Sequence, residues 1–165
     1  MRSQLNSYLD LPRPERAFLL QAGLPLIAVA AMLRLGGLDT SLRLLRRRLP
    51  PPLPVEPIPL PRIDEARRMA ELIKIAARRL PVNATCLRQS VLIWWLLRRQ
   101  RLPATLRLGV ARTQGFQAHA WVEIDGTVVN DSGDVARRFA VLHETTGRLG
   151  DAPTQPPAPN SASRR

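Results

Sequence analysis

The spacing of apolar residues changes once along this chain, from a helical repeat before Pro103 to an alternating repeat after it. Residues 62–80 and 84–101 carry apolar side chains at helical spacing, which predicts two helices. The second is apolar around most of its circumference, as expected of a helix buried at the centre of a domain. The alternating part predicts three strands, over 105–111, 117–124 and 127–131. Helices followed by an antiparallel meander define an α+β fold class.

A proline-rich stretch divides the chain, since seven of the twelve residues from 50 to 61 are proline. Proline breaks helices and removes hydrogen bonds from strands, so we predict an extended linker there. The predicted organisation is a helical N-terminal segment over 1–49, the linker over 50–61, a domain over 62–149 and a disordered tail over 150–165. Within the domain, a short helix or an irregular stretch is expected after Asp134.

The N-terminal segment holds two apolar stretches of different character. Residues 17–33 are uncharged, but the run ends at Arg34, short of the roughly 18–20 residues that a membrane-spanning helix needs. Acidic residues precede the run, which is not typical of a secretory signal, so we expect a buried or partner-facing helix and a cytoplasmic protein. Residues 40–49 predict a basic amphipathic helix, which either packs on the protein or contacts a membrane surface.

Charge and composition narrow the chemistry. The net charge is +12, from 25 basic and 13 acidic residues, and a basic surface attracts polyanions, acidic peptides or anionic membranes. No aromatic residues alternate with the arginines as a stacking platform for bases would require, so we do not expect nucleic-acid binding. One cysteine and two histidines provide neither a disulfide framework nor a zinc cluster. We expect no metal and no cofactor, and any role of the cysteine then depends on its thiol.

Cys86 and His119 are the candidates for a nucleophile and a general base. Cys86 belongs to the first turn of the 84–101 helix, where free backbone N–H groups and the helix dipole lower the pKa of a thiol. Taken alone, a cysteine on an apolar helix is more often a small core residue. His119 lies on the strand face opposite the apolar row of 117–124, where the alternative is an exposed polar position. An imidazole that faces a helix N-terminus can activate a thiolate.

Asp131 is the candidate for the residue that orients the imidazole. Residues paired across a hairpin point to the same face, so the length of the loop decides which residue lies opposite His119. A three-residue loop sets Asp131 directly across from His119. A two-residue loop, Asp125-Gly126, would instead set it opposite Ala120. We predict the three-residue loop or an equivalent bulge.

Other titratable side chains are weaker candidates. Glu123 shares a face with His119 but lies about 13 Å along the strand, which is too far for contact. Asp134 follows the last strand and is expected to cap the next helix. His143 has no acidic or thiol neighbour at catalytic spacing, so we expect no functional role for it.

An attack by a thiolate on a carbonyl creates an oxyanion, which needs hydrogen-bond donors. Backbone N–H groups at the start of a helix can provide them. Among side chains, we expect Gln89 to face away from Cys86, whereas Gln117 shares the His119 face and is the better candidate.

Two segments carry a resemblance to a known family. The run TCLRQSVLIWWLLRRQRLPATLRLGV and the later run FQAHAWVEIDGTVVND resemble the transglutaminase-like cysteine proteases of lasso peptide biosynthesis, the B2 proteins. The resemblance covers about residues 62–144 and implies a papain/transglutaminase-like core, in which a central helix that starts at the cysteine packs on an antiparallel meander. It also implies Cys86 as the nucleophile, His119 as the general base and acid, and Asp131 as the orienting residue.

The resemblance implies a leader peptidase, which releases the leader of a ribosomally synthesised lasso precursor peptide through a thioester. The implied partners are this precursor peptide, a small B1-type leader-recognition protein and a macrolactam-forming cyclase. Residues 1–61 are helical and proline-rich rather than a winged, strand-rich recognition module, which favours the split B2 arrangement. Two alternatives stay open: a transglutaminase-type acyl transferase that uses the same three residues, and a non-catalytic scaffold or leader-binding protein.

Overall fold

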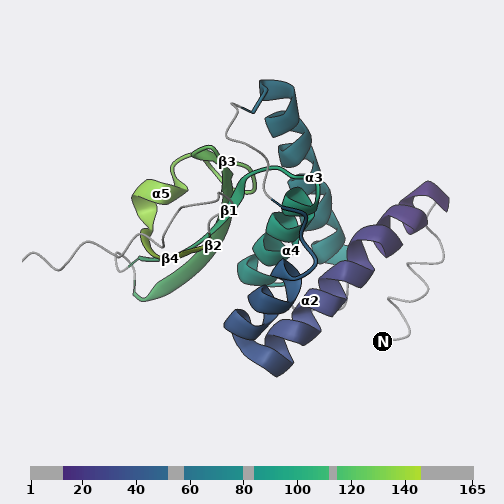
Figure 1. The fold of residues 1–165 in the computed structure, drawn as a ribbon, viewed down its shortest axis with the longest axis horizontal. Helices are drawn as coiled ribbons and strands as arrows, with labels where there is room; N and C mark the ends of the chain where they lie inside the picture. The colour runs from purple at the N-terminus through teal and green to yellow at the C-terminus, as the bar shows by residue number, and fades with distance from the viewer. Residues whose placement is uncertain (1–12, 52–57, 80–83, 112–114, 146–165) are drawn as a thin grey trace, which may run out of the picture.

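The computed structural model describes residues 13–51, 58–79, 84–111 and 115–145. Its helices are α2 (Arg13–Arg46), α3 (Leu60–Arg79), α4 (Cys86–Arg99) and the short α5 (Val135–Arg138). Its strands are β1 (Ala104–Ala111), β2 (Gln117–Ile124), β3 (Thr127–Val128) and β4 (Ala140–Thr145). The three long helices lie on one side of the sheet and α5 lies on the other (Figure 1). This combination of helices with an antiparallel sheet agrees with the predicted α+β class.

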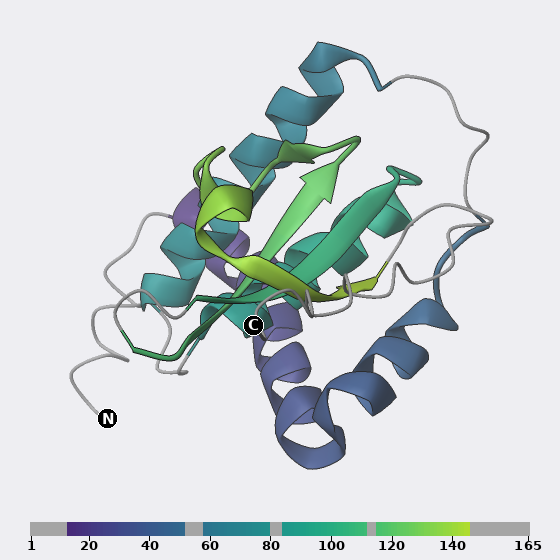
Figure 2. The ribbon, with the colours of Figure 1, turned by 90° about the vertical axis from the view of Figure 1, so that its left-hand side faces the viewer.

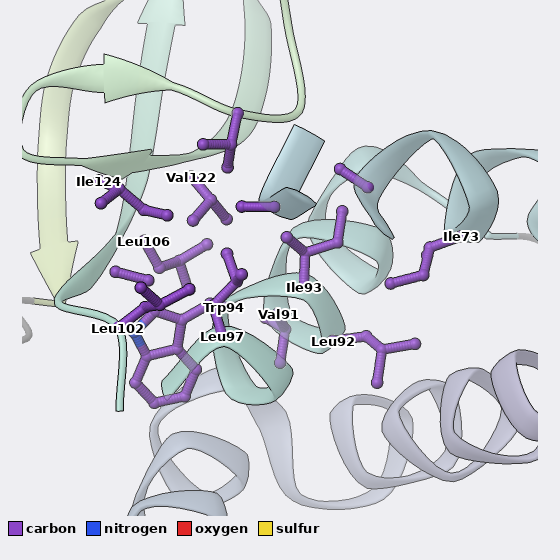
Figure 3. Packing of buried hydrophobic residues seen from close by; sticks show 14 of the residues in the cluster. Ile73, Val91, Leu92, Ile93, Trp94, Leu97, Leu102, Leu106, Val122 and Ile124 are labelled. Atoms are coloured by element: carbon purple, nitrogen blue, oxygen red, sulfur yellow. The ribbon is translucent and has the colours of Figure 1, made fainter. Parts of the chain in front are cut away.

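Helix α4 is the centre of the protein, because α2 and α3 pack on one side of it and the sheet packs on the other. Its most buried apolar side chains are at most 1% exposed: Val91, Leu92, Ile93, Trp94 and Leu97. Figure 3 shows them between Leu106 and Val122 of the sheet and Ile73 of α3. Full burial of one large apolar side chain contributes about 1.5–3 kcal/mol, so α4 holds these layers together.

The sheet is antiparallel, with the strand order β3-β2-β1-β4. Val122 and Ile124 of β2 belong to the core around α4. Odd-numbered residues face the other way, because side chains alternate along a strand. On this outer face lies a second, smaller cluster of buried residues, which comprises Trp121, Val128, Val135 and Phe139. The sheet therefore has an apolar layer on both faces.

Two expectations about the strands are wrong. The strand expected over 127–131 ends at Val128, where the chain begins to bend. The short helix expected after Asp134 is present as α5, but the residues that follow it form a strand that was not expected, β4, which pairs with β1. The alternation of β4 is hard to see in the sequence, because the β1–β4 register shifts between Leu108 and Gly109. Such an irregularity changes which residues share a face.

The turn between β2 and β3 also differs from the prediction. Ile124 pairs with Thr127, so the loop has two residues, and the expected three-residue loop is wrong. Asp125 has a φ of 47° and Gly126 a φ of 75°. Two successive left-handed residues form a type I′ turn, whose twist matches that of the flanking strands. Aspartate tolerates this conformation better than most residues, which makes the tighter turn accessible.

Helix α2 changes direction at Gly37, whose φ of 70° lies in the left-handed region. The Ser41 hydroxyl donates a hydrogen bond to the Gly37 carbonyl at 2.6 Å. The two halves of the helix form a V, which Figure 2 shows in purple and blue. The break lies between the two helical stretches expected at 17–33 and 40–49.

Both halves of α2 pack into the core around α4, through Leu26 and Val29 of the first half and Leu42 and Leu45 of the second. The stretch Ala22–Arg46 is long and apolar enough to cross a membrane by length and composition, but these four side chains contact protein. The division into segment, linker, domain and tail stays a prediction. The expected tail and much of the expected linker lie outside the described residues.

We expect Gly109→Ala to lower the free energy of unfolding by about 1–3 kcal/mol, because it overpacks the outer layer. A Cβ there would lie 2.9 Å from the Ala140 carbonyl oxygen and 3.0 Å from both Phe139 Cβ and Trp121 Cη2. Urea unfolding measures the change. Gly133→Ala is the control, because a Cβ at that position meets nothing within 4 Å. Equal losses in the two variants would contradict the packing described.

Candidate active site

Cys86 is the first residue of α4, as the sequence pattern indicated. Thr85 precedes it with an extended backbone, and the Thr85 side chain makes no cap hydrogen bond. The N–H groups of the first turn are therefore not occupied by a cap. The half-buried thiol receives backbone hydrogen bonds from Leu87 in that turn and from Ala120 on β2. These contacts place the sulfur between the helix start and the sheet.

His119 lies on β2, next to Ala120, and its ring forms hydrogen bonds with both Cys86 and Asp131. The distance from His119 Nε2 to Asp131 Oδ2 is 2.5 Å. This bond leaves Nδ1 as the ring nitrogen that can meet the thiol. The structure thus brings together the three residues selected from the sequence, and each comes from a different part of the fold.

Asp131 reaches His119 by another route than the sequence argument expected. With the two-residue turn, a continuous β3 would set Asp131 opposite Ala120. Because β3 ends at Val128 and the chain bends from Val129 to Asp131, the alternation of a strand no longer decides the direction of that carboxylate. The bend, rather than the length of the loop, brings the carboxylate to the imidazole.

A buried pair, Ser90 and Asn130, fixes this bend. The Val129 N–H donates to the Val122 carbonyl at 3.0 Å, as in a regular hairpin. The Val122 N–H then donates to Asn130 Oδ1 at 2.7 Å instead of to a strand carbonyl. The Asn130 amide in turn donates to Ser90 Oγ at 2.8 Å. The Asn130 side chain therefore replaces a strand residue and ties the bend to α4.

The backbone of Ala120 connects α4 to the sheet. Its N–H and C=O point to the same edge of β2 as those of Val122, two residues further on. The short β3 does not pair with them. Instead, Ser90 Oγ donates to the Ala120 carbonyl at 2.8 Å, and the Ala120 backbone hydrogen bonds to the Cys86 thiol. Side chains at the start of α4 thus take the place of the missing strand.

The sequence analysis overlooked Ser90 and Asn130, which are 0% and 7% exposed. A signal for both was present. Ser90 lies one helical turn after Cys86, so the two share a face of the helix. Asn130 directly follows the apolar residues Val128 and Val129, and a polar side chain that is buried there needs partners.

The contacts shift the pKa values of all three groups. The hydrogen bond with His119 lowers the pKa of the Cys86 thiol, and burial opposes this effect. The hydrogen bond with Cys86 raises the pKa of His119 against the effect of burial, and Asp131 raises it further. Burial alone would raise the pKa of Asp131, but its hydrogen bonds with His119 and the Ser132 backbone keep that pKa below its usual value. Together these directions favour a coupled pair of thiolate and imidazolium.

The three side chains line a cavity of about 220 Å³. The lining residues come from α3, α4, β2 and the bend after β3: Lys74, Cys86, Gln89, Ser90, His119, Ala120, Asn130 and Asp131. The expectation that Gln89 faces away from Cys86 is wrong, because residues three apart on a helix lie on nearly the same side. Its amide donates to the Ala84 carbonyl at 2.6 Å. Gln117 is exposed and does not line the cavity.

The weaker candidates do not line the cavity. Asp134 occupies the N-cap position of α5 but makes no side-chain cap hydrogen bond. His143 is exposed on β4. Glu123 is buried on the outer face of the sheet, where it accepts hydrogen bonds from Arg107 and Trp121.

The pH dependence of the reaction of Cys86 with iodoacetamide tests this coupling. Because the pKa of Cys86 is lowered, its thiolate should form with a midpoint below the value of about 8.5 of a free cysteine. His119→Ala removes the hydrogen bond that lowers this pKa, so the midpoint should rise and the rate at neutral pH should fall about tenfold. His143→Ala is the matched control. Identical profiles for wild type and His119→Ala would show that the two groups are not coupled.

Comparisons with known proteins identify the family of the chain. The chain is 37% identical over 62 residues to the microcin J25-processing protein McjB of Escherichia coli. That match covers 38% of this chain and 29% of the relative, so the matched segment is less than a third of the relative's length. No solved structure matches the chain. The family model of the transglutaminase-like superfamily matches residues 26–144, from α2 to β4. Because this match spans most of the chain, the chain belongs to the transglutaminase-like superfamily.

Proposed function

We propose that this protein is a cysteine peptidase that removes the leader from a ribosomally synthesised lasso precursor peptide. One observation carries the proposal: a half-buried thiol contacts an imidazole, and the other nitrogen of that imidazole meets a carboxylate, at the wall of a cavity. In this assignment Cys86 is the nucleophile, His119 is the general base and acid, and Asp131 orients the imidazole.

The reaction begins when the Cys86 thiolate attacks the carbonyl carbon at the junction of leader and core. Backbone N–H groups in the first turn of α4 hold the oxyanion of the tetrahedral intermediate. The imidazolium of His119 gives its proton to the nitrogen of the core peptide, which leaves as a free amine while the leader stays bound as a thioester. His119 then takes a proton from water, which attacks the thioester. The leader leaves as a carboxylic acid and Cys86 is restored.

Asp131 decides which nitrogen of the His119 imidazole carries the hydrogen in this scheme. A carboxylate accepts hydrogen bonds, so it favours the tautomer that carries its hydrogen on Nε2. That tautomer presents the lone pair of Nδ1 to the thiol, which can then transfer its proton. After the transfer, the charge of Asp131 stabilises the imidazolium.

The substrate class rests on similarity rather than on the geometry of the cavity. The relative described above is named for the processing of microcin J25, and the quoted segments resemble B2 proteins. We therefore include in the proposal a small B1-type leader-recognition protein and a macrolactam-forming cyclase as partners, and the cytoplasm as the location. The match covers 29% of that relative, so the precursor and the partners belong to the proposal.

Leader release tests the proposal. The full chain is incubated with its recognition partner and the precursor peptide, and the products are identified by mass spectrometry. Cys86→Ala is expected to abolish release, because no other described thiol can attack. Asp131→Asn is expected to slow release about 10²-fold or more, because an amide carries no charge to stabilise the imidazolium and its NH2 group can face the ring in place of an acceptor oxygen. Asp134→Asn and His143→Asn, which lie outside the cavity, are the controls.

The other outcomes separate the alternative functions. Equal release by wild type and Cys86→Ala would exclude the peptidase. A leader joined to an added primary amine would indicate acyl transfer, since an amine can attack the same thioester as water. A wild type that binds the precursor but forms neither product would indicate a scaffold.

A further inference from the structure

Two aromatic rings hold the imidazole of His119 on the outer face of the sheet. The Trp121 indole lies nearly parallel to the imidazole, with an interplanar angle of 18° and ring centroids 6.2 Å apart. The Phe139 ring, which follows α5, lies 5.0 Å from the imidazole at an angle of 31°. Both distances are in the range of ring–ring contact. Rotation of the imidazole about its Cβ–Cγ bond would therefore meet both rings.

A buried carboxylate fixes Trp121 in turn. Trp121 Nε1 donates to Glu123 Oε1 at 2.7 Å, and Arg107 Nε donates to Glu123 Oε2 at 2.7 Å. Glu123 is only 5% exposed, and Arg107 also bonds to Glu144 on β4. Residues of three neighbouring strands thus hold the indole in one orientation. Glu123 is too far along β2 to touch the imidazole, but Trp121 spans the distance between them.

The absence of a side chain at Gly109 leaves space for this arrangement. Gly109 pairs directly with His119 across β1 and β2, so a side chain there would point to the same face. Its Cβ would come within 3.0 Å of both Trp121 and Phe139. The Trp121 ring and the Phe139 Cβ therefore border the volume that any other residue at this position would fill.

We propose that Trp121 and Glu123 are positioning residues that act on Cys86 through His119. Glu123, held by Arg107, sets the indole, and the indole and the Phe139 ring keep the two imidazole nitrogens directed at the thiol and at Asp131. The expected effect on leader release rests on the proposed function. The expected effect on the ionisation of the Cys86 thiol does not, because the direction of the imidazole also governs how readily the thiolate forms.

The position of the imidazole matters because it serves two partners at once. A small rotation would move Nδ1 away from the thiol and Nε2 away from Asp131 together. Hydrogen bonds weaken steeply when the donor and acceptor lose their alignment. A displacement of about 1 Å in an active site can cost about 10²-fold in rate.

Charged groups surround the imidazole and its two aromatic neighbours. They are Cys86 of α4, Lys74 of α3, which lines the same cavity, Asp131 after β3, Arg107 of β1, Glu123 of β2, Glu144 of β4 and Arg138, which lies over the Phe139 ring. An exchange at Trp121 leaves every one of these charges in place. Its effect on the thiol therefore reports the orientation of the imidazole rather than a change in local charge.

The test measures the rate of alkylation of Cys86 by iodoacetamide against pH in the full chain. Trp121→Phe keeps an aromatic ring but removes the N–H that Glu123 holds. Glu123→Gln keeps the shape of the side chain but disturbs one of its two bonds, to Trp121 or to Arg107, so the result does not depend on one variant. In both, we expect the alkylation midpoint to move toward that of a free cysteine, with a loss of about threefold in rate at neutral pH, which is smaller than the loss in His119→Ala. Combining the two exchanges should add little, because both act through the same indole.

Two control variants separate a change in the orientation of the His119 imidazole from a loss of core packing. Trp95→Phe removes an indole N–H that has no hydrogen-bond partner among the described residues, and it should leave the profile unchanged. Glu144→Gln alters the other carboxylate bound by Arg107 but keeps the acceptor for Trp121, so its effect should be smaller than that of Glu123→Gln.

Urea unfolding is measured on the same variants. Loss of stability with an unchanged alkylation midpoint in Trp121→Phe and Glu123→Gln would overturn the inference, since a purely structural role predicts that result. Equal effects of Glu123→Gln and Glu144→Gln would overturn the role of the indole. Leader release is assayed in parallel. A shifted midpoint in a protein whose wild type releases no leader would support the inference and contradict the proposed peptidase.

Discussion

The structure depends on the need to pair the backbone of Ala120 at the edge of β2. Buried N–H and C=O groups must find hydrogen-bond partners, and β3 ends before it can supply them. The start of α4 supplies them instead, through the Ser90 hydroxyl and the Cys86 sulfur. The contact that docks the central helix on the sheet is therefore the contact that sets the thiol beside His119. Assembly of the core and assembly of the site are one event.

The thiol owes its lowered pKa to neutral donors and one imidazole rather than to the many arginines of the chain. No described arginine lines the cavity, and its one basic side chain besides His119 is Lys74, which is paired with Glu71 at 2.7 Å. Burial works against the charged form, so the hydrogen bonds from His119, Ala120 and Leu87 must exceed it. The reactivity of the sulfur thus depends on short-range geometry, which salt screens less than it screens interactions between exposed charges.

Local patterns predicted the elements that are defined by local spacing. The periodicity indicated α3, α4 and the first two strands, and it placed Cys86 in the first turn of a helix expected to begin near residue 84, whereas α4 begins at Cys86 itself. The errors arose where distant contacts decide the outcome. The register shift of β4 and the end of β3 at Val128 depend on neighbouring strands and on Asn130, which the alternation of apolar residues does not report.

Asp131 shows most clearly what local sequence patterns could not predict. The hairpin argument selected the residue that does contact His119, but it assumed a three-residue loop that the chain does not form. The actual cause is the hydrogen bond from the Asn130 side chain to Ser90, which lies 40 positions from Asn130 in the sequence. The error about Gln89 is of a different kind, since ordinary helical geometry already places this residue on the same side of α4 as Cys86.

The packing of α2 changes what the proline-rich stretch contributes to the protein. Leu26 and Leu42 precede that stretch and α4 follows it, yet all of them share one core. The stretch then serves as a tether, which gives the first helix a high effective concentration at its binding face. Cleavage of a peptide bond in this stretch would remove that advantage, whereas the core contacts of Leu26 and Leu42 do not depend on that bond. Two fragments cut there would still form a non-covalent complex, whose stability would depend on their concentration.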